Sequence, residues 1–413
     1  MKREDLVKHI SFIPETGMKT FSVEAEMFEF LKDRKALDEV VECHGYDIVS
    51  DQLENNKLIA ATGGYAGDKR LIYRNELVTD DELCHVMENR MFLLSFPYRG
   101  DRTQLPVAIS VEDQMYKRSK TNCAYIMQEE TDARRDVLLC DERSRLVTDG
   151  FAKTKSKVHL LIRNGLVWAI NDGIHVHTPE LDLVESLFDS LMDFEDVELK
   201  SSLFTNDSTY VRIGITDSKS EKLLVGLLDD IGFAYETVSL GVQFTDGTRG
   251  NSASRVQPIL EIDGRPIPFG NELRMEHRSD RGDKSSSIEY WRTLCGQMYS
   301  LIEDSTEQIK KFAGIKIKNP GGTLRMAAFK EKFPLEATLK VASNLEYSFP
   351  GGCTALDIYV ALYDIIDVYA ESISDGMTPI ARLGWEEKAS RFLKRDVTDI
   401  DLSAEAYLAL CRS

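Results

Sequence analysis

The sequence contains no paired cysteines, no long apolar run and no secretion signal. Its seven cysteines are far apart within 413 residues and include no C-x-x-C pair, which is typical of reduced thiols and excludes a dense disulfide framework. No window of about 18 uninterrupted apolar residues occurs, and the opening MKREDLVKHISF is charged where a signal peptide is apolar. We therefore expect a cytoplasmic protein with no membrane partner.

Recognisable catalytic and phosphate-binding motifs are also missing. The glycine-rich segment ATGGYAGDK (61–69) follows an apolar run, but Asp68 separates Gly67 from Lys69, whereas a phosphate loop needs Gly directly before Lys. No G-x-S-x-G segment occurs, and no Cys, His and Asp residues are grouped in the chain. We predict no catalytic residue and no cofactor, and we expect a protein that is not an enzyme.

Acidic residues outnumber basic ones, and their distribution is uneven. The net charge of −18 repels polyanions at long range, which argues against general nucleic-acid binding but not against a local basic groove. Residues 179–198 contain eight acids and no Lys or Arg, whereas residues 310–340 contain eight bases and two acids. These two stretches are the most informative features of the charge pattern.

Residue patterning predicts an α+β protein in three parts. We expect a mixed segment at 1–150, a β-rich antiparallel segment at 151–284 and a helical segment at 285–413. In the first part, apolar residues at helical spacing predict one amphipathic helix over 23–43. In the second, two apolar runs joined by Arg163-Asn164-Gly165 predict a hairpin over 158–170.

Further strands and helices follow from the same patterns. The middle part has strand patterns at 209–215, 237–244 and 256–262 and helix patterns at 179–194 and 220–230. The last part has helix patterns at 286–312, 324–332, 335–344, 354–373, 379–394 and 404–411. Thr354 and Asp357 have the spacing of a capping box at the start of one of these helices.

The order of segments in the second half resembles a group of phage- and plasmid-borne proteins. The residues that carry it are GVQFTDGTRGNSASRVQPILEIDGRPIPFGNEL (241–273), a long helix, and a closing helix TALDIYVALYDI (354–365). Residues 268–271 (PFGN) replace a cysteine-asparagine-glycine turn of the group. The resemblance implies a mobile element in a bacterial host, with a role as an accessory factor of DNA replication or recombination, or as an inhibitor of host defence.

The basic stretch 310–340 is the first candidate site. It interleaves cations with Phe312, Phe329 and Phe333 around an Asn-Pro-Gly-Gly turn, as contacts to the backbone and bases of a single strand require. The predicted nucleic-acid-binding residues are Lys310, Lys311, Lys316, Lys318, Arg325 and Lys330. The alternative is that these bases neutralise the acidic helix of the same chain or of a neighbouring subunit in a homo-oligomer.

The acidic helix over 179–194 is the second candidate. Steps of three and four residues place four acids on one face, opposite an apolar stripe. The predicted partner-binding residues are Asp182, Glu185, Asp189 and Asp193. Such a face would bind a divalent ion, dock a basic host protein or imitate nucleic acid, and the alternative is a solvated outer surface.

Two histidines form the third candidate, the metal site of a metal-dependent enzyme. His175 and His177 are two residues apart, so on a strand both rings would point to one face, as in a metal site. No second histidine cluster supplies further ligands, and His159 is the other histidine of interest. The alternative is a solvated or hydrogen-bonded strand face.

Overall fold

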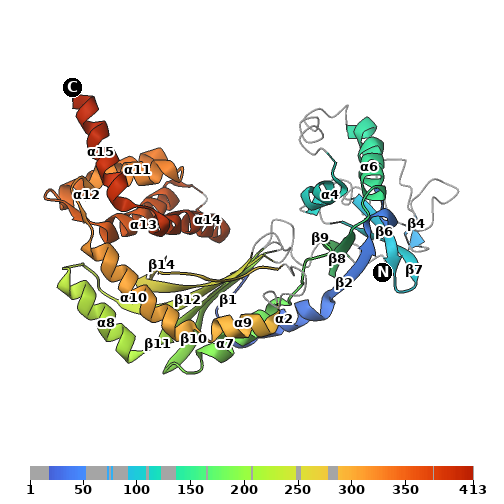
Figure 1. Cartoon of the computed structure of the whole chain (residues 1–413), viewed down its shortest axis with the longest axis horizontal. Coiled ribbons are helices and arrows are strands. Elements are labelled where there is room, and N and C mark those ends of the chain that lie inside the picture. The colour runs from blue at the N-terminus through green and yellow to red at the C-terminus, as the bar shows by residue number, and fades with distance from the viewer. Residues whose placement is uncertain are drawn as a thin grey trace.

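The computed structural model confirms an α+β fold, with antiparallel sheets in the middle of the chain and helices in the C-terminal part (Figure 1). Among the described helices, none is both long enough and apolar enough to cross a bilayer. The structure describes residues 18–52, 72–73, 76–77, 92–107, 111–121, 136–163, 166–205, 208–247, 253–277, 287–374 and 376–412. The glycine-rich segment 61–69 and the dipeptide 164–165 lie outside these residues.

A seven-stranded antiparallel sheet forms the centre of the molecule. Its strand order is β1-β10-β11-β12-β13-β14, and β15 also pairs with β13. The strands are β1 (Lys19–Phe21), β10 (Asp196–Phe204), β11 (Thr209–Thr216), β12 (Val238–Asp246), β13 (Ser254–Ile262), β14 (Arg265–Pro268) and β15 (Leu273–Met275).

The two faces of this sheet differ in chemistry because side chains alternate along each strand. On β11, Val211 and Ile213 join the apolar core, whereas Tyr210 and Arg212 lie on the opposite, polar face. Helices line the apolar side in Figure 1. They are α2 (Glu24–Leu37), α7 (Glu180–Leu191), α8 (Ser218–Asp230), α9 (Ile288–Cys295) and α10 (Met298–Gly314).

A helical bundle follows α10 at one end of the sheet (Figure 1). It consists of α11 (Pro320–Lys330), α12 (Leu335–Ser348), α13 (Ala355–Ser372), α14 (Pro379–Ser390), the 3-10 helix η4 (Arg391–Lys394), α15 (Val397–Arg412) and a small sheet of β16 (Lys316–Ile317) and β17 (Cys353–Thr354). The predicted capping box is present, because the Thr354 hydroxyl accepts from the Asp357 amide at 3.2 Å and Asp357 accepts from the Thr354 amide at 2.8 Å.

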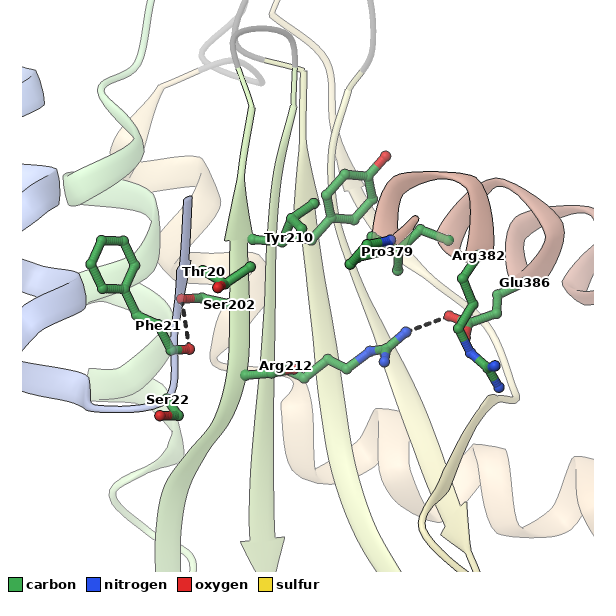
Figure 2. A pocket seen from close by; sticks show the side chains of 12 residues that line it. Thr20, Phe21, Ser22, Ser202, Tyr210, Arg212, Pro379, Arg382 and Glu386 are labelled. Atoms are coloured by element: carbon green, nitrogen blue, oxygen red, sulfur yellow. Dashed lines mark hydrogen bonds and ion pairs between the residues drawn. The ribbon is translucent and has the colours of Figure 1, made fainter. Parts of the chain in front are cut away.

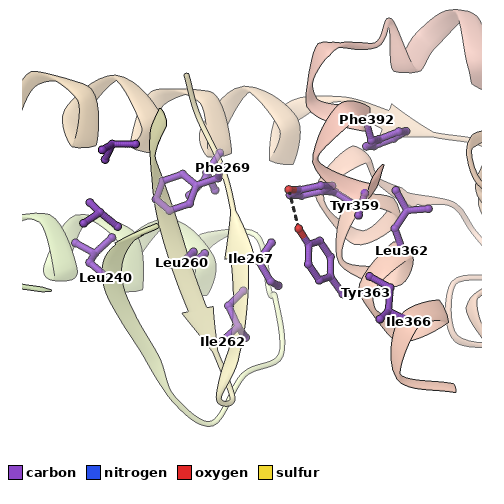
Figure 3. Packing of buried hydrophobic residues seen from close by; sticks show 14 of the residues in the cluster. Leu240, Leu260, Ile262, Ile267, Phe269, Tyr359, Leu362, Tyr363, Ile366 and Phe392 are labelled. Atoms are coloured by element: carbon purple, nitrogen blue, oxygen red, sulfur yellow. Dashed lines mark hydrogen bonds between the residues drawn. The ribbon is translucent and has the colours of Figure 1, made fainter. Parts of the chain in front are cut away.

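The bundle and the sheet share one apolar core (Figure 3). Tyr359 and Tyr363 on α13 face Ile267 and Phe269 at the end of β14, and all four side chains are buried. The Tyr359 hydroxyl donates a hydrogen bond to the Pro268 carbonyl. The contact satisfies a buried hydroxyl and connects the bundle to the sheet.

A second, separate core holds together a lobe built mainly from the first part of the chain. The predicted hairpin is present as β8 (Lys157–Arg163) and β9 (Leu166–Asp172), and Val107 forms an isolated bridge with Val167 of β9. The lobe contains β2 (Asp38–His44), the 3-10 helix η1 (Gly45–Asp47), β3 (Val49–Gln52), β4 (Ile72–Tyr73), β5 (Glu76–Leu77), β6 (Phe92–Tyr98), β7 (Asp101–Pro106), α4 (Glu112–Ser119), α6 (Asp136–Ala152), β8 (Lys157–Arg163) and β9 (Leu166–Asp172).

Two predicted helices are wrong in extent. The helix expected over 23–43 ends at Leu37, and the following residues form β2, where Val40 and Val41 pair with β8. The long helix expected over 286–312 is two helices, separated near Gly296.

The division into segments at 150 and 285 stays a prediction, although β1 and β2 of the first segment pair with strands of the second.

Candidate nucleic-acid interface

The basic stretch folds into the turn and two helices that follow β16. Asn319 caps α11 by accepting from the Gly322 amide at 3.1 Å, and Pro320 occupies the first turn, where its missing N–H costs nothing. Asp401 of α15 accepts from the Lys318 amide at 3.1 Å, the Asn319 amide at 3.2 Å and the Thr323 hydroxyl at 2.8 Å. One buried carboxylate therefore fixes the start of α11 against α15.

An apolar groove with a cationic rim lies among α11, α12 and α15. Its cavity volume is about 890 Å³. The residues lining it are Gly322, Arg325, Met326, Phe329, Lys330, Lys332, Phe333, Leu335, Thr338, Leu339 and Ala404. We call this feature the α11–α12 groove.

Large apolar side chains are exposed in the α11–α12 groove. Phe329 is 79% exposed and Leu335 70%, although both stand beside a buried core. Phe333, in contrast, is buried and packs on Trp385 of α14 with ring centroids 5.2 Å apart. The groove thus has a fixed base and one aromatic ring, Phe329, presented to solvent, an arrangement that often marks a binding surface.

Two lysines of the rim carry uncompensated charge. The side-chain ammonium groups of Lys330 and Lys332 form no hydrogen bond or ion pair with the part of the chain that the structure describes. The acid between them, Glu331, is buried and bound instead to Arg391 at 3.3 Å and Arg395 at 2.5 Å. The carboxylate closest in sequence therefore does not neutralise the rim.

The other predicted cations are distributed around this groove and not all within it. Arg325 lines it and is bound to Glu346 at 3.2 Å, while Lys310 lies on α10 and contacts Glu307 at 3.7 Å. Lys311, Lys316 and Lys318 are exposed, and none of them lines the groove.

The structure therefore brings together Arg325 and Lys330 of the predicted set and adds Lys332, which belongs to the same basic stretch. It also adds Leu335 and Leu339, which carry no sequence signal beyond their place in a helix.

The acidic helix does not neutralise these cations within the chain. Asp182 is bound to Lys35 at 2.6 Å, and Glu180 is buried against Arg34 at 3.1 Å. Glu185 and Asp189 are exposed on α7, and Asp193 lies beyond the end of this helix at Leu191. Of the alternatives considered for the basic stretch, intramolecular pairing with α7 is therefore not observed among the described residues.

The histidines join a buried polar cluster between the central sheet and the lobe. His175 and His177 follow β9 outside any extended strand, and the His175 ring lies 5.6 Å from the ring of His277. His277 Nε2 is 2.8 Å from Asp246 Oδ1 and 3.1 Å from the Ser254 hydroxyl. Among the described residues, no group of three or more His, Cys, Asp or Glu side chains is arranged to hold a metal ion.

The charges in this cluster are set by burial and by pairing. Burial, reinforced by His277, lowers the pKa of His175 to about 3. Burial alone would lower the pKa of His277, but the Asp246 carboxylate outweighs it and raises that pKa above the ordinary 6.5. Ser254, His277 and Asp246 resemble a nucleophile, base and acid in composition only, because all three are buried and His277 uses the same nitrogen for both contacts.

Comparisons of the chain with protein-family models, curated proteins and solved structures give no match. The resemblance to phage- and plasmid-borne proteins therefore stays a prediction.

Proposed function

We propose that this protein is a non-enzymatic accessory factor of DNA metabolism, of the phage-like kind, that binds single-stranded nucleic acid in the α11–α12 groove. The observation that carries this proposal is the exposed ring of Phe329 beside Lys330 and Lys332, two cations with no partner among the described residues. An aromatic face with adjacent cations is the combination that binds a flexible strand, through base stacking and phosphate contacts.

The chemistry of the groove favours a single strand over a duplex. A base can stack on Phe329 only when it is free of its own helical stack, as in single strands and loops. The apolar walls at Met326 and Leu339 would accept the faces of bases, whereas the phosphate-rich exterior of a duplex would find few cations there. The net charge of −18 opposes binding elsewhere on the molecule.

A charge-reversal experiment tests this proposal. Fluorescence anisotropy with a labelled 20-base single strand should show wild-type binding that Lys330→Glu/Lys332→Glu weakens by more than about tenfold, since each lost phosphate contact also becomes a repulsion. Lys32→Glu/Lys222→Glu makes the same change in net charge at exposed positions of α2 and α8 and should bind like wild type. Equal loss in both variants would mean that net charge alone controls binding and would reject the groove as the site.

A second function is supported by the acidic face. The side chains of Glu185, Asp189 and Asp193 are exposed and form no hydrogen bond or ion pair with the described residues, and Met192 beside them is 75% exposed. Exposed carboxylates around an apolar side chain suit a basic protein partner, such as a host protein that handles nucleic acid. Capture of such a partner should be weakened in Glu185→Gln/Asp189→Asn/Asp193→Asn, and undiminished capture would reject this role.

A further inference from the structure

A separate cavity lies between the sheet and α14 (Figure 2). Its volume is about 350 Å³, within the range of small-molecule sites. The residues lining it are Thr20, Phe21, Ser22, Ser201, Ser202, Leu203, Tyr210, Arg212, Pro379, Arg382, Leu383 and Glu386. None of them belongs to the α11–α12 groove, so the cavity is independent of the proposed function.

A buried carboxylate organises two arginines at one side of this cavity. Glu386 is 1% exposed, and its carboxylate accepts from Arg382 Nε at 3.0 Å and from Arg212 Nη2. Arg212 also donates from Nε to Gln243 at 2.9 Å, and Arg382 donates from Nη2 to Asp367 at 2.7 Å. Figure 2 shows Arg212 extending from β11 toward Glu386 and Arg382 on α14.

These contacts hold both guanidinium groups in place without using all their donors. The Nη1 group of Arg212 and that of Arg382 form no hydrogen bond with the described residues, and the two side chains are 19% and 32% exposed. Arg212, Arg382 and Glu386 are the charged residues that line the cavity, and Asp367, which binds Arg382, does not line it. A preorganised arginine pair with free donors is suited to a carboxylate or phosphate group.

The remaining wall combines hydroxyl and apolar groups. Thr20, Ser22 and Ser201 contribute hydroxyls from β1, the turn after it and β10, and Leu203 and Leu383 contribute apolar surface. The Ser202 hydroxyl is already used, because it donates to the Phe21 carbonyl at 3.2 Å. A ligand that fits this wall has an anionic group at the arginines and an apolar body toward the leucines.

We propose that the cavity between β1, β10, β11 and α14 binds a small organic anion, a carboxylate or phosphate monoester with an apolar body. Arg212 and Arg382 bind the anionic group through their free Nη1 donors, and Glu386 is a positioning residue that fixes both guanidinium groups. Because the cavity joins the sheet to the bundle, the bound anion also stabilises the contact between them.

Isothermal titration calorimetry of the full chain with benzoate, phenyl phosphate, inorganic phosphate and benzylamine tests this assignment. We expect saturable one-to-one binding of benzoate or phenyl phosphate. Binding of benzoate would indicate a carboxylate ligand, and binding of phenyl phosphate would indicate a phosphate monoester. Benzylamine has the same ring with the opposite charge and should not bind. Absence of binding by both aromatic anions, or inorganic phosphate binding as tightly as phenyl phosphate, would overturn the proposed ligand class.

Two variants test whether the anion binds in this cavity. Arg382→Met removes charged hydrogen bonds and should weaken the anion by about tenfold or more. That change also removes contacts to Glu386 and Asp367, so Ser201→Trp provides a second test. Ser201 is an exposed strand residue in the cavity wall, and a tryptophan ring in its place should fill the cavity and abolish binding. Ser239→Trp adds the same ring to β12 outside the cavity, and it should bind like wild type. Unchanged affinity in Ser201→Trp would overturn the proposal.

Discussion

His277 Nε2 lies 2.8 Å from Asp246 Oδ1, and both side chains are almost completely buried between the central sheet and the lobe. The contact raises the pKa of His277 above 6.5 and lowers that of Asp246 below 3.8, in each case against the opposing effect of burial. The pair therefore couples folding to pH.

Asp246→Asn should remove one part of the pH dependence of stability. A raised histidine pKa contributes stability that is complete below pH 6.5 and is lost as the pH rises through the folded-state pKa. Urea denaturation of the wild type should show this loss above pH 6.5, whereas Asp246→Asn should lack it and be less stable by about 3 kcal/mol at pH 6. Asp230→Asn, at an exposed position, is the control, and an unaltered slope in Asp246→Asn would contradict the assignment.

His175 should produce the opposite dependence on the acidic side. Its pKa is about 3 because burial and the nearby His277 disfavour its charged form, so its contribution is complete above pH 6.5 and is lost as the pH falls toward 3. The slope from one such group is at most about 1.4 kcal/mol per pH unit. His175→Phe keeps a ring that cannot titrate, and its unfolding free energy should vary less between pH 6.5 and 4.5 than that of the wild type.

Asp401→Ala should weaken both the bundle and the groove. The substitution leaves two backbone amides and the Thr323 hydroxyl without their acceptor, at a cost of about 2–4 kcal/mol in the free energy of unfolding. Asp399→Ala, two residues earlier and exposed, should cost less than about 1 kcal/mol. Equal unfolding midpoints for the two variants would show that the Asp401 contacts contribute little.

Phe329→Ala should weaken single-strand binding without lowering the stability of the protein. Because Phe329 is 79% exposed, its loss should hardly change the unfolding midpoint, while the lost stacking should weaken single-strand binding by about 1–3 kcal/mol. Tyr347→Ala removes a different exposed ring, on α12, which is 88% exposed and does not line the groove, and this variant should bind like wild type. Similar losses in both variants would indicate a non-specific contribution from exposed rings.

The sequence predicted those parts of the fold that are determined by residues close together in the chain. The hairpin at β8–β9 and the capping box at Thr354 are encoded by neighbouring residues, and both are present. Val40 and Val41 have helical spacing with the residues before them, but pairing with β8, more than 100 residues later, makes them a strand. Pairing of this kind is invisible in a local pattern.

The candidate sites also combine residues that the sequence pattern indicates with residues that only the tertiary structure brings together. Phe329, Lys330, Leu335 and Leu339 belong to the stretch that the charge pattern indicates. The groove also needs Ala404 of α15, which only tertiary packing brings to them. His277 and Asp246 lie far along the chain from His175, so the buried cluster could not be predicted from the His175/His177 spacing. The cavity residues Arg212, Arg382 and Glu386 lie on β11 and α14, and their pairing carries no sequence signal.

The salt dependence of wild-type binding to single- and double-stranded oligonucleotides of one sequence tests the central claim most directly. Contacts of Lys330 and Lys332 with phosphates release counterions, so the logarithm of the affinity should fall linearly with the logarithm of the salt concentration, with a slope of at least about 1.4 in magnitude for two contacts. We predict salt-sensitive binding that prefers the single strand. Absence of binding to the single strand at low salt, or a preference for the duplex, would contradict the proposal that the α11–α12 groove binds single-stranded nucleic acid.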